Sequence, residues 1–293
     1  MVAAGWGQRA IAHVRRSASG EPLDRSLRVT LNFHPERLRD GDTVLRCLAR
    51  DGVYRSQFET GTSNGGLTAH PGGNRWRWEQ RLFGHAYDDA PPSERPRYGA
   101  LDHRRHPLGG AARFGSAHLR LSEAVLDRST FCFPDSVFEP TAVATADRFG
   151  LFPLVDRFDA RPLTDEIEAT AGGVLDGYVE AHVHGPVRLA ADVEALVLDP
   201  SFRGSPTEDE AYALGVRVEW HEGRRLAAEV LAEHPAFRGP RTVEVGRRIA
   251  VDGLLDAAVI GRAVVTGTED PQDLKKLWQC VARFGSAPGA DPK

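Results

Sequence analysis

The stretch YVEAHVHG, Tyr178–Gly185, alternates apolar residues with residues whose side chains form hydrogen bonds. Because alternate side chains of a β-strand point to the same face, the pattern predicts a strand with one apolar and one polar face. The polar face carries a carboxylate and two imidazoles, from Glu180, His182 and His184. An exposed face would tolerate these groups, but burying them without a function is costly, so the stretch indicates a site as well as a sheet.

Strands and helices are expected on either side of this stretch without a repeating strand–helix–strand unit. Strand patterns occur in Leu27–His34 and in the segments RYGALDH, ARFGSAHLRL, RSTFCF and DVEALVLD. Helical patterns occur in DTVLRCLARDG, with Asp42 as the expected N-cap, and in NRWRWEQRLFGHAYD, with Asn74 as the expected cap. We therefore expect a mixed α+β unit over residues 30–200.

Three parts are expected along the chain. Residues 1–26 read as an amphipathic helical lead that ends in the break SASGEP. Residues 27–204 form the α+β unit, and residues 205–293 form a mainly helical region that packs on it. The prediction of a helical C-terminal region rests on the helical apolar stripes of EGRRLAAEVLAEHP and PQDLKKLWQCVARFG.

The composition is that of a soluble globular protein, with 41% hydrophobic and 27% charged residues in a chain of 293. Its three cysteines are widely spaced and form neither a disulfide framework nor a metal-binding pattern, which indicates the reducing cytoplasm. The apolar segment LLDAAVIGRAVV is short and interrupted by charges. We therefore expect no interaction with a membrane.

The charge is unevenly distributed along the chain. Residues 1–120 contain 19 Arg and 12 Asp plus Glu, a balance of +7, so the remaining residues carry −11 of the total of −4. This asymmetry favours a polyanionic ligand near the N-terminal part, a nucleotide or a nucleic acid. One hypothesis is thus a non-catalytic nucleotide- or nucleic-acid-binding module. Its candidate residues are Arg75, Arg77, Arg95, Arg97, Arg104 and Arg105.

The polar stretch YRSQFETGTSNGGL, Tyr54–Leu67, follows the strand that ends at His34. It is either a surface turn in which Gly65 and Gly66 supply positive φ, or a segment that holds a polar ligand. The candidate ligand-binding residues here are Tyr54, Ser56, Gln57, Thr62, Ser63, Asn64 and Gly65.

Two chemistries suit the polar face around Glu180. The pair His182-x-His184 can place two imidazoles on one metal ion, as in metal-dependent hydrolases of the amidohydrolase type. Alternatively, Glu180 alone can steady the positive charge that develops when the nicotinamide–ribose bond of NAD breaks. Further ligands for the metal alternative are sought among His34, His85, His103 and Asp135.

Several segments together resemble a bacterial family known as domain of unknown function 3626, over roughly residues 25–290. They are LNFHPERL, DGVYRSQFETGTSNGGLTAHPGG, WEQRLFGHAYD, RPRYGAL, ARFGSAHLRL and YVEAHVHGPVRLAADVEALVLDPSF. The family name supplies no activity.

The order of elements is more distantly similar to the ADP-ribosyltransferase superfamily. The resemblance implies a mixed or antiparallel split sheet with flanking helices, and NAD as the substrate. It further implies that His34 contacts a ribose hydroxyl, Tyr54 stacks on nicotinamide, Ser63 supports the site and Glu180 is catalytic. Tyr178 stands where that superfamily usually has a second carboxylate or Gln, which puts protein arginine modification in doubt. DNA, RNA or a small molecule remains open as the acceptor, and the basic N-terminal part favours a nucleic acid.

Overall fold

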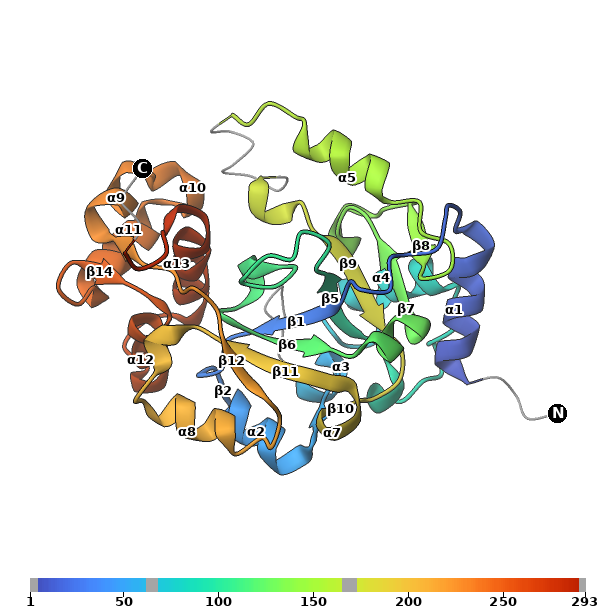
Figure 1. Cartoon of the computed structure of the whole chain (residues 1–293), viewed down its shortest axis with the longest axis horizontal. Coiled ribbons are helices and arrows are strands. Elements are labelled where there is room, and N and C mark those ends of the chain that lie inside the picture. The colour runs from blue at the N-terminus through green and yellow to red at the C-terminus, as the bar shows by residue number, and fades with distance from the viewer. Residues whose placement is uncertain (1–4, 62–67, 165–172, 290–293) are drawn as a thin grey trace.

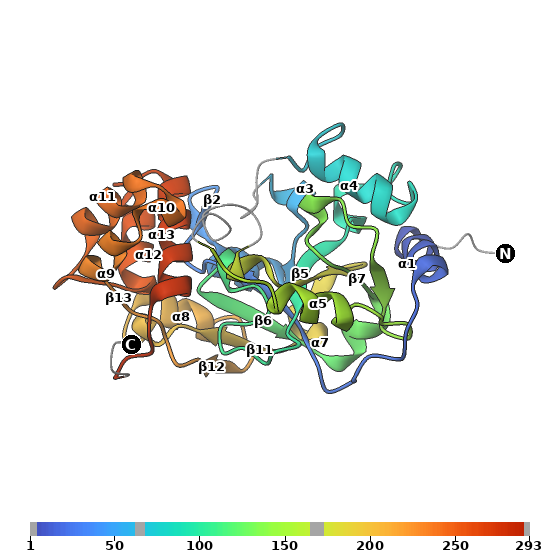
Figure 2. The same ribbon diagram turned by 90° about the horizontal axis from the view of Figure 1, so that it is seen from above.

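The computed structural model describes residues 5–61, 68–164 and 173–289. Its centre is a mixed eight-stranded sheet flanked by helices (Figures 1 and 2). The neighbours in this sheet are antiparallel except the pair β11–β12, which is parallel. In spatial order the strands are β12 (Val218–Trp220), β11 (Val193–Leu198), β6 (Ala117–Leu121), β1 (Val29–Phe33), β5 (Arg97–Leu101), β9 (Val179–Val183), β7 (Ser129–Cys132) and β8 (Val143–Thr145). The predicted α+β class with a mixed sheet is confirmed.

Short strands and helices surround this sheet. Three two-stranded pairs are β2 (Leu38–Arg39) with β3 (Asp42–Thr43), β4 (Val53–Tyr54) with β10 (Val187–Arg188), and β13 (Leu226–Ala227) with β14 (Leu254–Leu255). The α-helices are α1 (Trp6–Ser17), α2 (Val44–Asp51), α3 (Gln57–Thr60), α4 (Asn74–Phe83), α5 (Phe152–Asp159), α7 (Leu189–Asp192), α8 (Pro206–Tyr212), α9 (Ala228–Glu233), α10 (Pro235–Arg238), α11 (Pro240–Ile249), α12 (Ala257–Thr266) and α13 (Pro271–Phe284). The 3-10 helices are η1 (Pro92–Glu94), η2 (Ala112–Phe114), η3 (Glu123–Arg128), η4 (Ser136–Phe138), η5 (Val174–Asp176) and η6 (Pro200–Phe202).

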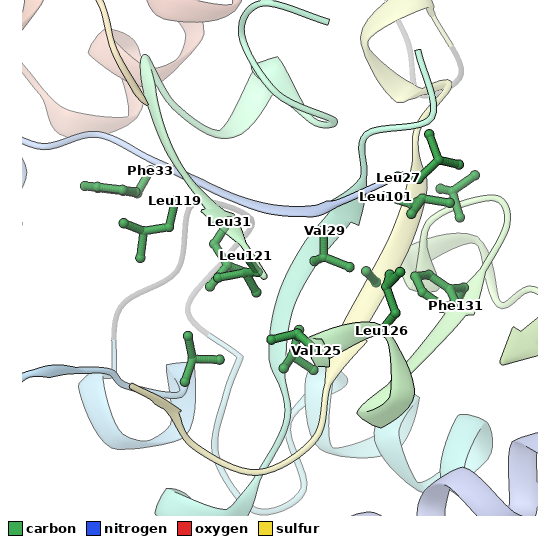
Figure 3. Packing of buried hydrophobic residues seen from close by; sticks show 14 of the residues in the cluster. Leu27, Val29, Leu31, Phe33, Leu101, Leu119, Leu121, Val125, Leu126 and Phe131 are labelled. Atoms are coloured by element: carbon green, nitrogen blue, oxygen red, sulfur yellow. The ribbon is translucent and has the colours of Figure 1, made fainter. Parts of the chain in front are cut away.

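The two faces of the sheet differ in character, as the alternation in the sequence predicts. On β1, Val29, Leu31 and Phe33 enter the main hydrophobic core, which also receives side chains from α2, α5 and α8 (Figure 3). The intervening residues Thr30 and Asn32 face the opposite side, together with Glu180 and its neighbours on β9. That second face is covered in part by α1 and α4, and a small apolar cluster of Ala100, Ala111 and Tyr178 also lies on it.

The sheet splits between β1 and β5. These strands pair only at Val29 with Leu101 and at Thr30 with Ala100, after which β1 continues along β6 alone. Close contact at the split requires a glycine in β5, because a Cβ on Gly99 would lie 2.5 Å from the carbonyl oxygen of Thr30. The side chains that β1 and β5 carry beyond this point are free to line a cavity.

Two expected helix caps are displaced by one residue. The N-cap of α2 is Thr43, which accepts a hydrogen bond from the amide of Arg46, and not Asp42. Asp42 instead lies in the β2–β3 pair and forms an ion pair with Arg50. Helix α4 begins at Asn74, so that Gly73 is its N-cap and no side chain caps it. Both helices nevertheless occupy the expected segments.

The region after residue 204 is helical except for its short strands, and helices α9–α13 gather at one end of the sheet (Figure 1). They enclose a second hydrophobic cluster around Trp278, which is fully buried. The indole Nε1–H of Trp278 donates to the carbonyl oxygen of Ala112 at 2.8 Å, which fastens α13 to η2. Strand β12 belongs to the same region and forms an edge of the main sheet, so the region packs on the α+β unit through both features.

Within residues 5–61, 68–164 and 173–289, none of the helices is both long and apolar enough to cross a membrane.

Candidate functional site

A cavity of about 510 Å³ opens at the split between β1 and β5. Asn32 and His34 at the end of β1 line one side, and Tyr98 and Gly99 of β5 line another. Glu180 reaches the same cavity from β9, the neighbour of β5. Residues from distant parts of the chain thus meet where the backbone pairing stops, in a cavity whose volume suits a ligand of nucleotide size.

The polar side chains on β9 form one continuous chain of hydrogen bonds with Thr130 and Tyr87. Tyr87 hydroxyl lies 2.6 Å from Nδ1 of His184, and Nε2 of His184 lies 2.9 Å from Oγ1 of Thr130. Thr130 Oγ1 is also 3.2 Å from Nδ1 of His182, whose Nε2 lies 2.8 Å from Oε1 of Glu180. Since an ionised carboxylate only accepts, Nε2 of His182 donates its proton to Glu180.

Glu180 is the end of this chain and is ionised. It is 5% exposed, and burial alone would raise its pKa. The hydrogen bond from His182, together with the charges of His182 and Arg75, overcomes burial and holds the pKa of Glu180 below its usual range. His184, by contrast, is neutral, because burial holds its pKa well below the usual value.

The His182–His184 pair does not converge on a common point. Both ring nitrogens of each imidazole have partners in the protein, as described above. Among the described residues, the group that could hold a metal ion is Cys132, Glu180 and His182, whose ligand atoms lie within 4.8 Å of one another. Burial, with the charges of nearby carboxylates, raises the pKa of the Cys132 thiol well above its usual value, and the thiol donates to Glu180 at 3.8 Å. In this arrangement the three side chains are linked by hydrogen bonds from Cys132 and His182 to Glu180.

Asp135 supplies a second carboxylate to the cavity, next to Glu180. It precedes η4, where its Oδ1 accepts from the amide of Val137 at 2.9 Å, and its Oδ2 accepts a hydrogen bond from the hydroxyl of Tyr178. Burial and the charge of Glu180 raise the pKa of Asp135 to about 6. Two carboxyl groups with pKa values driven apart are suited to different roles in one reaction.

Arg75 of α4 contributes a buried positive charge. Its guanidinium lies 4.1 Å from the ring centroid of Tyr98 and 5.2 Å from that of Trp78, and the side chain is 7% exposed. Its charge is one of those that lower the pKa of Glu180. Contact with the rings holds the guanidinium in place, while its Nε and Nη1 have no hydrogen-bond partner among the described residues.

His34 lies at the expected strand end and lines the cavity. It is 8% exposed, and its ring meets that of Trp278 edge to face at 5.8 Å. Burial, with the charges of Arg37 and Lys275, lowers the pKa of His34 to about 3, so the imidazole is neutral. A neutral imidazole can donate or accept one hydrogen bond at Nε2, as contact with a ribose hydroxyl requires.

Several buried polar atoms in the lining have no hydrogen-bond partner among the described residues. They are Nε2 of His34, Nε of Arg39, Oε1 of Gln57, Nε and Nη1 of Arg75, and Nε of Arg113. Buried polar groups are almost always paired in folded proteins. Their concentration around one cavity indicates a polar ligand.

The candidate residues of the polar stretch Tyr54–Leu67 fall into three groups. Tyr54 and Gln57 line the cavity, and the ring of Tyr54 packs edge to face on Phe33. Ser56 does not line it, so its predicted ligand role is not supported: its hydroxyl donates to the carbonyl of Pro92, and it caps α3 together with Glu59. The remaining candidates lie outside the described residues; they are Thr62, Ser63, Asn64 and Gly65.

Comparison with known proteins identifies the family. A family model described as "Protein of unknown function (DUF3626)" matches residues 28–156 and 150–282. The chain belongs to the DUF3626 family. A curated relative, the "Gene 2 protein" of Mycobacterium phage L5, is 28% identical in an alignment over 163 residues that covers 51% of this chain. The match spans 59% of that phage protein's length.

The predicted arginine surface is only partly present in this DUF3626 protein. Arg95 and Arg97 are each 2% exposed and bond within the protein, Arg95 to Glu79 at 2.5 Å and Arg97 to the carbonyl of Tyr54 at 3.1 Å. The expectation that they form a nucleic-acid surface is therefore wrong, since burial leaves them no contact with a macromolecule. Arg75 is also buried, whereas the rest of the group is exposed: Arg77, Arg104 and Arg105.

Proposed function

We propose that this DUF3626 protein cleaves the nicotinamide–ribose bond of NAD and transfers ADP-ribose to an acceptor. One observation carries the proposal: His34, Tyr54, Gln57 and Glu180 line a single cavity although the chain separates them widely. The resemblance to ADP-ribosyltransferases assigns roles to three of them, and the split of the sheet between β1 and β5 fits a split-sheet architecture.

Glu180 supplies the electrostatic part of the reaction. When the bond between the anomeric carbon and the nicotinamide nitrogen breaks, its electron pair leaves with neutral nicotinamide and positive charge develops on the ribose. A fixed ionised carboxylate stabilises that charge by several kcal/mol in a site that excludes water. The hydrogen bond from His182 holds Glu180 ionised and oriented, so His182 is a positioning residue.

Asp135 supplies the proton acceptor. An acceptor hydroxyl or amine that forms the new bond to the anomeric carbon must lose a proton, and a carboxylate with a pKa of about 6 takes that proton near neutral pH. Tyr178, which stands two residues before Glu180, holds Asp135 through its hydroxyl. The second carboxylate of the site is thus proposed to come from the segment after β7.

His34, Tyr54 and Gln57 bind the substrate in this account. The free Nε2 of neutral His34 and Oε1 of Gln57 offer hydrogen bonds to ribose hydroxyls or to the nicotinamide amide. The ring of Tyr54 stacks on the nicotinamide, whose bond to ribose then faces Glu180. The acceptor stays open between nucleic acids and small molecules.

The test is release of nicotinamide from NAD by the purified protein, alone and with nucleic acid or cell extract as the acceptor. Isothermal titration calorimetry in parallel measures NAD binding. If the protein neither binds NAD nor releases nicotinamide from it, the proposal is overturned. Elemental analysis of the same sample tests the metal-dependent hydrolase: stoichiometric zinc, iron or manganese that is lost in Cys132→Ser, without NAD turnover, would favour that alternative.

A further inference from the structure

Helix α13 of the C-terminal region contributes to the cavity. Among the described residues that line the cavity, Lys275 alone comes from the chain after residue 204. It lies one helical turn before Trp278, on the same face of α13. Trp278 is fully buried, packs edge to face on His34 and is bonded to Ala112, so the position of Lys275 is fixed relative to the end of β1.

Positive charges crowd around Lys275. Burial, followed by the charges of Arg113, Arg37 and Arg238, lowers the pKa of the Lys275 ammonium to about 8. Arg113 is paired with Asp176, whereas no hydrogen bond or ion pair joins Lys275 to any other described residue. A half-buried ammonium among like charges is unfavourable unless an anion accompanies it.

Two of the basic residues around Lys275 line the same cavity as Glu180. The charge of Arg75 is among those that lower the pKa of Glu180, whereas the charges of Arg113 and Arg37 lower the pKa of Lys275. All five side chains line the same cavity. A ligand that fits it has an anionic part near Lys275 and a part that becomes positive near Glu180.

We propose that Lys275, with Arg37 and Arg113, binds the diphosphate of the substrate, so that the C-terminal helix α13 completes the NAD site. This inference rests on the proposed function for the identity of the ligand. Phosphate oxygens accept hydrogen bonds from ammonium and guanidinium groups, and two adjacent phosphates match a cluster of several cations. The neighbouring Nε2 of His34 then lies beside the diphosphate, where a ribose hydroxyl belongs.

The test uses the full chain and four probes in calorimetry: ADP-ribose, inorganic pyrophosphate, and the diphosphate-free compounds adenosine and nicotinamide riboside. We expect ADP-ribose and pyrophosphate to compete for one site and to bind more weakly as salt is added. The diphosphate-free compounds should bind at least tenfold more weakly than ADP-ribose. Lys275→Ala should weaken ADP-ribose binding about tenfold, and Lys275→Arg should restore most of it, since the charge returns.

Lys276→Ala is the matched control, because Lys276 is exposed on the same helix. The affinity of this variant for ADP-ribose should stay within about twofold of the wild-type affinity. The change is thus much smaller than the tenfold loss, about 1.4 kcal/mol, expected for Lys275→Ala. Equal effects of the two alanine variants, or no binding of ADP-ribose and pyrophosphate to a protein that releases nicotinamide, would overturn the diphosphate site and leave the proposed function standing. Pyrophosphate binding that depends on Lys275, without NAD turnover, would support the anion site and refute the transferase.

Discussion

Nε2 of His182 lies 2.8 Å from Oε1 of Glu180, on the same buried face of β9. The bond orients the carboxylate and lowers its pKa, against the effect of burial, which raises it. Behind His182, the bonds through Thr130 and His184 to Tyr87 use every polar atom of the imidazoles. The site is therefore supported by a fully paired network, which holds its groups rigidly.

Replacing His182 by Ala should shift the pH dependence of NAD cleavage. The bond from His182 lowers the pKa of Glu180, so its removal raises that pKa, and the loss of activity on acidification should begin at a higher pH than in wild type. We expect kcat to fall about tenfold or more at neutral pH. The measurement is a pH–rate profile of nicotinamide release; an unchanged acidic limb would show that His182 does not act on Glu180.

Replacing Thr130 by Val should lower the stability of the protein more than it lowers the rate of NAD cleavage. Valine keeps the shape and strand preference of threonine but removes the hydroxyl that bonds to both imidazoles. Leaving two buried ring nitrogens unpaired should lower the free energy of unfolding by about 1–3 kcal/mol. Urea denaturation measures this loss, and a stability equal to wild type would contradict the hydrogen-bond network.

Replacing Asp135 or Tyr178 should change the pH dependence of ADP-ribose transfer, because Tyr178 acts on the pKa of Asp135. Asp135 must be ionised to accept a proton, so transfer in wild type should fall as the pH decreases through about 6. The hydrogen bond from Tyr178 lowers the pKa of Asp135, and Tyr178→Phe should therefore move this limb to higher pH. Asp135→Asn should remove the limb and reduce transfer by about 10²-fold. A limb that persists unchanged in Asp135→Asn would assign it to another group.

Ser56 should matter to stability and not to the ligand. Its hydroxyl accepts from the amide of Glu59 and donates to the carbonyl of Pro92, so Ser56→Ala should lower the free energy of unfolding by about 1–2 kcal/mol. Its affinity for NAD should equal that of wild type in calorimetry. Tyr54→Ala is the contrasting variant, because Tyr54 lines the cavity and its loss should weaken NAD binding.

The sequence predicts those parts of the fold and site that depend on local pattern. Alternation of apolar and polar residues places Glu180, His182 and His184 on one face of a strand. The proline that follows His34 ends the strand pattern, which places His34 at the end of β1. The sequence also indicates that Ser56 caps a helix, because a serine followed three residues later by a glutamate, here Glu59, is the pattern of a capping box. The sequence contained that signal, but the composition of the whole stretch favoured a ligand-binding loop.

Other features depend on contacts that no local pattern encodes. Asp135 reaches Glu180 because β7 pairs with β9, and Lys275 reaches the cavity because Trp278 packs on His34. The burial of Arg95 likewise follows from its place between the rings of Phe58 and Trp76, which only the tertiary fold brings together. An arginine in a polar segment usually stays exposed, so the prediction of an arginine surface followed the more frequent case.

The most direct measurement compares Glu180→Gln with wild type in nicotinamide release and in NAD binding. Glutamine keeps the oxygen that accepts from His182, so the variant should fold normally and bind NAD with near wild-type affinity. Without the negative charge, release should fall by about 10²–10³-fold or more. Glu229→Gln, an exposed position on α9, is the matched control and should leave release unchanged. Wild-type release in a folded, NAD-binding Glu180→Gln variant would contradict the account.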